Sequence, residues 1–198
     1  MSHRLCALVL LPLFLIPLAA ADRYAGLDTA KFLGPLRVET TLPGEKNFTE
    51  GPAVDAAGNV FFTNPGEILK WAPAAKQLST FRKPSNGANG QAFDRQGRLL
   101  HCEAADGSHG RVTRTDLRSG ELTVLCDKFN GFPLGGPNDV CVDGSGRIYF
   151  TSRLANTNPA TGNVNAVYRI DPDGKVARIR KAAVALYDLH IEAQGLIT

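Results

Sequence analysis

Three oxygen-bearing side chains occupy the same position in three related segments of the sequence. Glu50 opens EGPAVDAAGNVFFTN, Asn89 opens NGQAFDRQGRLLHCE, and Asn138 opens NDVCVDGSGRIYFTS. One carboxylate and two amide carbonyls are hard oxygen donors, which suit Ca²⁺, Mg²⁺ or Mn²⁺ better than Zn²⁺. Three such side chains at equivalent positions of the repeats therefore predict a divalent-cation site. Each residue also has a simpler interpretation, because Asn is common in turns and Glu50 fits a solvated loop.

The elements that must position these side chains can be predicted from the same segments. In each segment a short apolar strand ends in an aspartate, a glycine follows three residues later, and a second apolar-rich strand begins. The aspartates are Asp55, Asp94 and Asp143, and the glycines are Gly58, Gly97 and Gly146. The aspartate side chain can cap a tight turn, and glycine can adopt the positive φ that the turn requires. Each segment therefore predicts a β-hairpin.

A second hairpin is predicted after each of these segments. ILKWAPAAKQLSTF, VTRTDLRSGELTVL and VYRIDPDGKVARI alternate apolar and polar residues, with turn signals at residues 118–120 and 171–174. Such alternation is typical of half-exposed antiparallel strands. Two hairpins make a four-stranded sheet, and the turn aspartates are 39 and 49 residues apart, close to the roughly 40–50 residues of a propeller blade. The fold class predicted is all-β, a β-propeller, because a long β-sandwich would not repeat this unit three times.

The repeats also divide the chain into segments. We expect a signal peptide over 1–21, an N-terminal segment over 22–41, a partial propeller over 42–180 and an aberrant tail over 181–198. Residues 36–42 could complete another sheet, whereas the tail lacks the aspartate and turn glycine of a repeat. Propellers close with ~4–8 blades, so three repeats predict a truncated propeller. Its open edges would permit self-association.

The first 21 residues have the organisation of an export signal. A short basic start precedes a continuous apolar run, and Ala19, Ala20 and Ala21 precede Asp22. The apolar run is short for a membrane span, which needs about 20 residues. We therefore predict a periplasmic or secreted protein cleaved near Ala21, without stable membrane insertion afterwards. An uncleaved N-terminal anchor is the alternative.

Cysteine content and charge exclude other classes of function. Cys102, Cys126 and Cys141 remain after cleavage, with no C-x-x-C spacing, so neither a zinc site nor a redox motif is indicated. Each lies in an apolar run, which favours buried free thiols over a disulfide. The net charge is +3, with no basic block beyond residues 178–181. Nucleic acid is therefore not expected as a partner.

The segments FTEGPAVDAAGNVFFTN, ANGQAFDRQGRLLHCE and GGPNDVCVDGSGRIYFTS resemble blade motifs of the gluconolactonase, or regucalcin (senescence marker protein), family. That family comprises six-bladed calcium-dependent propellers that hydrolyse sugar lactones and related esters. The resemblance extends over roughly residues 42–179 and corresponds to the N-terminal half to two-thirds of the family.

The resemblance implies roles for particular residues. Glu50 and Asn138 match metal ligands, with Ca²⁺ as the ion. Asn89 matches an asparagine that contacts the substrate or, in some relatives, lies close to the metal. Glu103, at the end of LLHCE, could line the substrate pocket, although an exposed turn residue is an equal alternative. Asp139 is expected to support the loop. We interpret His101 and His109 as channel-rim or surface residues.

One departure from the family limits the functional prediction. The family's P-N-G-x-x-x-S-x-D segment, and the aspartate after it that completes the metal site, have no match in this sequence. Asp188 lies in the tail without a surrounding motif, so no catalytic residue is assigned. We expect a metal-dependent hydrolase of sugar lactones or related esters that is incomplete in this chain. The alternatives are an inactive truncated propeller that acts as a binding or assembly module, and a phosphotriesterase-like or strictosidine-synthase-like propeller.

Overall fold

The computed structural model describes residues 26, 28, 31, 34–44, 47–105, 109–153 and 164–181. The chain divides into two compact units, Met1–Val38 and Glu39–Thr198, and every strand lies in the second. In the first unit, exposed Lys31 and Asp28 form an ion pair of 3.8 Å. The predicted signal peptide and residues 182–198 of the predicted tail lie outside the described residues. Within the described part, no helix is long and apolar enough to cross a membrane.

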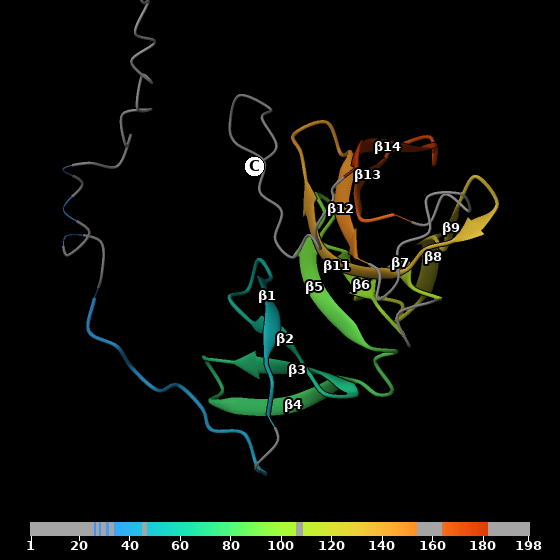
Figure 1. Ribbon diagram of the computed structural model, residues 1–198. Helices are drawn as coiled ribbons and strands as arrows, with labels where there is room; N and C mark the ends of the chain where they lie inside the picture. The colour runs from blue at the N-terminus through green and yellow to red at the C-terminus, as the bar shows by residue number, and fades with distance from the viewer. Residues whose placement is uncertain are drawn as a thin grey trace, which may run out of the picture. The chain divides into compact units, whose positions relative to one another are not determined.

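The described residues of the second unit form three four-stranded antiparallel sheets and a small two-stranded ribbon. In each four-stranded sheet every strand pairs with the next one along the chain (Figure 1). The first sheet contains β1 (Glu50–Val54), β2 (Val60–Asn64), β3 (Glu67–Ala72) and β4 (Gln77–Arg82). The second contains β5 (Ala88–Phe93), β6 (Leu99–Glu103), β7 (Arg111–Thr115) and β8 (Leu122–Cys126). The third contains β11 (Gly136–Val142), β12 (Ile148–Arg153), β13 (Ala166–Ile170) and β14 (Val176–Lys181). The two-hairpin unit predicted from the sequence is thus confirmed in all three repeats.

The first strands of the three sheets lie side by side. β5 packs against β1 on one side and against β11 on the other, as Figure 1 shows. Successive sheets that meet through their first strands are the arrangement of propeller blades around an axis. The predicted β-propeller class is therefore confirmed, and the β-sandwich alternative is wrong.

The aspartate turns form as predicted. Asp55 Oδ1 accepts hydrogen bonds from the backbone N–H groups of Ala57 (2.9 Å) and Asn59 (2.8 Å). Gly58 follows with φ of 82°, a conformation that glycine adopts without steric cost. The turns at Asp94 and Asp143 repeat these two backbone hydrogen bonds and the positive-φ glycine. Each first hairpin is therefore closed by its own carboxylate.

Two apolar cores hold the blades together. Phe61 lies between the first and second sheets, where it makes edge contacts with Phe81 (5.0 Å between ring centroids) and Phe93 (5.5 Å). A larger core joins the second and third sheets, and in it Phe150 stacks on Tyr168 at 5.3 Å. Burying one such ring stabilises the fold by about 1.5–3 kcal/mol. The alternation of side chains along the strands of the second blade thus directs one face to each of the two cores.

The cysteines are free thiols, as predicted. Cys102 and Cys126 are buried, whereas Cys141 is half-buried. Burial raises the pKa of Cys126 to about 11 and, aided by the charge of Asp139, raises that of Cys141 to about 12. These thiols remain protonated at neutral pH and serve as small apolar side chains.

Two features of the strand pattern differ from the prediction. Residues 36–42 form no strand, because they have no pairing partner among the described residues, and Leu36 is fully exposed. A two-stranded ribbon of β9 (Lys128–Phe129) and β10 (Phe132–Pro133) was not predicted. Its turn is Asn130-Gly131, both at positive φ, which is a strong local hairpin signal.

Candidate cation site

A β-bulge interrupts the first strand of every blade at the same end. Between the paired positions of each bulge, the first strand advances three residues while the second strand advances two. The bulges span 50–53, 88–91 and 137–140. Asn89 and Asn138 lie inside their bulges, and Glu50 is the first residue of its own. Since bulges re-aim side chains and are frequent next to binding sites, these three positions are structurally distinct from the rest of their strands.

Two glycines bring the three bulges into backbone contact. A Cβ on Gly90 would lie 2.5 Å from the Asn138 carbonyl oxygen and 2.6 Å from the Asp139 Cα. A Cβ on Gly51 would collide with the Asn89 carbonyl oxygen and lie 2.9 Å from the Gly90 Cα. Only glycine permits such close approach. The structure therefore places the strand segments carrying Glu50, Asn89 and Asn138 next to one another.

Hydroxyl and amide groups fix the bulges in place. Thr63 Oγ1 donates to the Glu50 carbonyl at 3.1 Å, and the Asp139 N–H donates to Thr151 Oγ1 at 3.0 Å. Gln91 Nε2 donates to the Gly51 carbonyl at 3.2 Å, which links the second blade to the first. Sequence reasoning missed all three side chains. The two threonines had a signal, because FTN and FTS end the second strand of the first and third repeats.

The side chains of Glu50, Asn89 and Asn138 have no hydrogen-bond or ion-pair partner among the described residues. Glu50 and Asn89 are half-buried, and Asn138 is only 4% exposed. None of their polar atoms is among the fully buried, unpaired side-chain atoms of the described residues, so these atoms reach the surface. Three polar side chains on neighbouring backbone segments thus have unused hydrogen-bonding or ligating capacity among the described residues.

The chemistry of the three side chains matches an oxygen-preferring cation. Within the described ranges, no group of three or more His, Cys, Asp or Glu residues could hold a metal, and this group contains one carboxylate and two amides. Ca²⁺ binds carboxylate and amide oxygens in sets of six to eight, so these residues would supply part of its shell. The assignment of Glu50 and Asn138 to the metal, and of Asn89 to the substrate, stays a prediction.

Glu103 lies at the same end of the second blade but in a different environment. It ends β6 opposite Ala88, it is fully buried, and both oxygens accept two hydrogen bonds each. The donors are Thr113 Oγ1 (2.6 Å) and Arg82 Nη2 (2.8 Å) to Oε1, and Arg111 Nε (2.7 Å) and Asn86 Nδ2 (3.0 Å) to Oε2. The exposed-turn alternative for Glu103 is therefore wrong, because four donors hold the carboxylate inside. Its role in substrate binding stays a prediction.

The pKa of Glu103 reflects this network. Burial alone would raise the pKa, but the hydrogen bonds from Thr113 and Arg111 and the charge of Arg82 outweigh it and lower the pKa. Arg82 ends β4, so Glu103 ties the first blade to the second. Arg82 Nε and Nη1 and Ser85 Oγ are buried without a partner in the described part of the chain, and buried waters commonly complete such groups.

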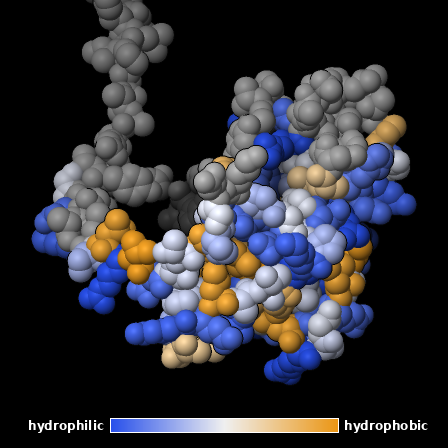
Figure 2. Space-filling view, turned by 90° about the horizontal axis from the view of Figure 1, so that it is seen from below, coloured by the Kyte–Doolittle hydropathy of each residue, from blue (hydrophilic) through white to orange (hydrophobic). Residues whose placement is uncertain are grey.

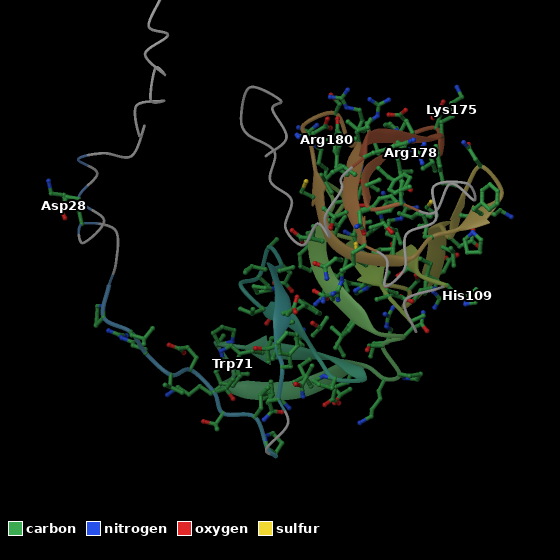
Figure 3. The ribbon with its side chains drawn as sticks, viewed as in Figure 1. Asp28, Trp71, His109, Lys175, Arg178 and Arg180 are labelled. Atoms are coloured by element: carbon green, nitrogen blue, oxygen red, sulfur yellow. The ribbon has the colours of Figure 1, made fainter. Side chains whose placement is uncertain are left out.

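The two histidines are in different environments. His101 is fully buried in β6, and its Nε2 lies 3.0 Å from Thr115 Oγ1. Burial and the charge of Arg82 lower its pKa to about 3. The interpretation of His101 as a rim or surface residue is therefore wrong, because its strand faces a core on both sides. His109, labelled in Figure 3, is exposed as predicted.

Comparison with known proteins identifies the family. Residues 48–186 match the family model of the SMP-30/gluconolactonase/LRE-like region. The chain belongs to this family. A gluconolactonase of Zymomonas mobilis is 28% identical to it over 157 residues, which make up 68% of this chain and 43% of the relative.

Solved structures agree with this assignment. A protein provisionally described as a gluconolactonase superposes with a TM-score of 0.66 at 27% identity, covering 76% of this chain and 55% of its own. A gluconolactonase from Xanthomonas campestris superposes with a TM-score of 0.60 at 28% identity, covering 70% of this chain and 48% of its own. This SMP-30/gluconolactonase-like chain thus spans about half the length of the relatives it matches.

Proposed function

We propose that this chain carries part of the active site of a cation-dependent hydrolase of sugar lactones or related esters. The proposal rests on three side chains without a partner among the described residues, at adjacent bulges of three consecutive blades: Glu50, Asn89 and Asn138. Membership of the SMP-30/gluconolactonase-like family supports the substrate class. Small-molecule sites of this kind place a few convergent polar groups on a rigid scaffold.

Glu50 and Asn138 are the residues that would hold the cation. Glu50 supplies the negative charge, and Asn138 adds a neutral oxygen from a nearly buried position. A bound divalent cation supplies electrophilic stabilisation of the negative charge that develops on a carbonyl oxygen during hydrolysis. Ca²⁺ is the proposed ion, because both donors are hard oxygen ligands.

The protein's contribution to the reaction is to position groups. The Thr63 and Thr151 hydroxyls fix the bulges that carry the two proposed ligands. Asn89 offers both an amide donor and a carbonyl acceptor, so it can orient a hydroxyl-bearing substrate beside the cation. Gly51 and Gly90 allow the three backbone segments to lie in contact. The relative positions of these segments therefore do not depend on flexible side chains.

Hydrolysis of glucono-1,5-lactone, followed by acid release, tests the proposal. The spontaneous rate is subtracted with a chelator-treated sample, and CaCl₂ is then added back. We expect Ca²⁺-dependent hydrolysis that Glu50→Gln and Asn138→Ala abolish and that Glu121→Gln, an exposed control on a turn, leaves unchanged. Identical rates for the chain with Ca²⁺ and with chelator would reject hydrolysis and favour the inactive binding module instead.

A further inference from the structure

A pocket lies between the second and third blades, away from the candidate cation site. It has a volume of about 530 Å³ and an apolar floor of Leu125, Val142, Ile148 and Ile170. Its mouth is formed by turns at the other end of the strands, including the one that starts at Asp94. Asp94 follows Asn89 by five positions along an extended strand, or about 16 Å at 3.3 Å per residue. The pocket is therefore distinct from the Glu50–Asn89–Asn138 group.

The acidic side chains at the mouth of this pocket already have partners. Asp94 pairs with Arg98 Nε at 2.7 Å, Asp171 with Arg169 Nε at 2.7 Å, and Asp173 with Lys175 Nζ at 2.8 Å. Lys175, labelled in Figure 3, lies at the turn between β13 and β14. The negative charges of the rim are thus neutralised within the protein.

Arg114 and Arg95, by contrast, line the pocket without a hydrogen-bond or ion-pair partner among the described residues. Arg114 lies in β7 between Leu100 and Thr123 of the neighbouring strands and is half-buried. Leu100 belongs to the core between the second and third blades, so the Arg114 side chain leaves the sheet on the face that borders the pocket. Arg95 is exposed at the mouth. The pocket therefore combines an apolar floor with two uncompensated positive charges.

We propose that this pocket binds a small organic anion whose hydrocarbon part fills the floor and whose carboxylate or sulfonate pairs with Arg114. A half-buried guanidinium forms two parallel hydrogen bonds to such a group, and these strengthen as water is displaced. The volume falls within the roughly 300–1,000 Å³ of small-molecule sites. Arg95 adds positive potential at the entrance and thereby favours anions over neutral molecules.

Calorimetric titration with 1-naphthalenesulfonate, at about 0.15 M salt to screen exposed charges, tests the proposal. We expect a single site in the full chain and at least roughly tenfold weaker binding to Arg114→Gln, the loss expected for one charge-assisted pair. Arg118→Gln removes the same charge from an exposed turn residue after β7 and should bind as the unmodified chain does. The neutral analogue 1-naphthol should bind to the unmodified chain no more tightly than 1-naphthalenesulfonate binds to Arg114→Gln.

A second variant tests the location without altering charge. Val142→Phe fills the floor and should weaken sulfonate binding, while thermal unfolding shows that the variant remains folded. Equal affinity of the sulfonate for Arg114→Gln and Arg118→Gln would overturn the proposal. Equal affinity of the unmodified chain for 1-naphthol and for the sulfonate would overturn it as well. Neither result depends on lactone hydrolysis or on Ca²⁺.

Discussion

Two polar groups at the same end of the blades are organised in opposite ways. In the Glu103 cluster, a fully buried carboxylate accepts four hydrogen bonds, two of them from arginines. In the neighbouring group, Glu50, Asn89 and Asn138 have no side-chain partner among the described residues. A buried charge is tolerated when it is paired and hydrogen-bonded, whereas polar atoms that reach the surface can stay unpaired at little cost. The first group therefore stabilises the fold, and the second is available to a ligand.

On the face shown in Figure 2, hydrophobic residues lie in several separate groups among hydrophilic ones. Scattered apolar residues of this kind are ordinary on protein surfaces. The difference between the two groups lies in partners and burial, so substitutions within each group can test it.

The largest expected effect on stability is that of Glu103→Ala. It leaves Arg82, whose side chain is 17% exposed, and Arg111 without their carboxylate, and breaking such a buried pair typically costs about 3–5 kcal/mol. Urea unfolding measures the change in the free energy of unfolding. Asp173→Asn breaks an exposed pair with Lys175 and should leave stability unchanged. Similar losses in the free energy of unfolding for Glu103→Ala and Asp173→Asn would show that the Glu103 cluster stabilises the fold no more than an exposed ion pair does.

Gly90→Ala should disturb the unpartnered group alone, because Gly90 carries the backbone contact between the second and third bulges. The added Cβ would meet the backbone of Asn138 and Asp139 at 2.5–2.6 Å, so one bulge must shift at a cost of about 1–3 kcal/mol. Gly144→Ala is the matched control, because its Cβ would meet only an Arg95 side-chain atom at 3.9 Å. Urea unfolding of both variants should show a loss for Gly90→Ala alone. Unchanged stability of Gly90→Ala would mean that the bulges do not need close backbone contact.

The free energy of unfolding should depend on pH through His101, which is fully buried. Its folded pKa of about 3 lies below the unfolded value of about 6.5, so the unfolded chain binds the proton first as pH falls. Its contribution to stability is complete above about pH 6.5 and is lost between pH 6.5 and 3. Between pH 7 and pH 5 the loss is about 2 kcal/mol. His101→Gln should remove this part of the pH dependence, and an identical pH profile for the variant would contradict the assignment.

The sequence predicted the fold well because its signals are local. Asp55, Asp94 and Asp143 each close a turn with nearby backbone groups, so a single repeat contains all the information that its hairpin needs. The alternation of the second hairpins depends equally on neighbouring residues. Asn130-Gly131 carried a similar local signal that was overlooked.

The environment of individual side chains was harder to predict because it depends on other blades. Glu103 and His101 occur in one short run, LLHCE, whose pattern does not show that Arg82 from the previous blade lies against it. The three candidate residues could be placed at equivalent positions from the repeat alone. Their contact through Gly51 and Gly90, and their lack of partners, required the structure.

The central claim is that the unpartnered group, and not the Glu103 cluster, binds a cation. Calorimetric titration of CaCl₂ into the chelator-treated chain tests it most directly, with Glu50→Gln, Asn138→Ala and the control Glu67→Gln, whose carboxylate pairs with Lys83. We predict saturable Ca²⁺ binding that is at least roughly tenfold weaker in Glu50→Gln and Asn138→Ala and unchanged in Glu67→Gln. Absence of Ca²⁺ binding, or equal affinity in all four proteins, would contradict the claim.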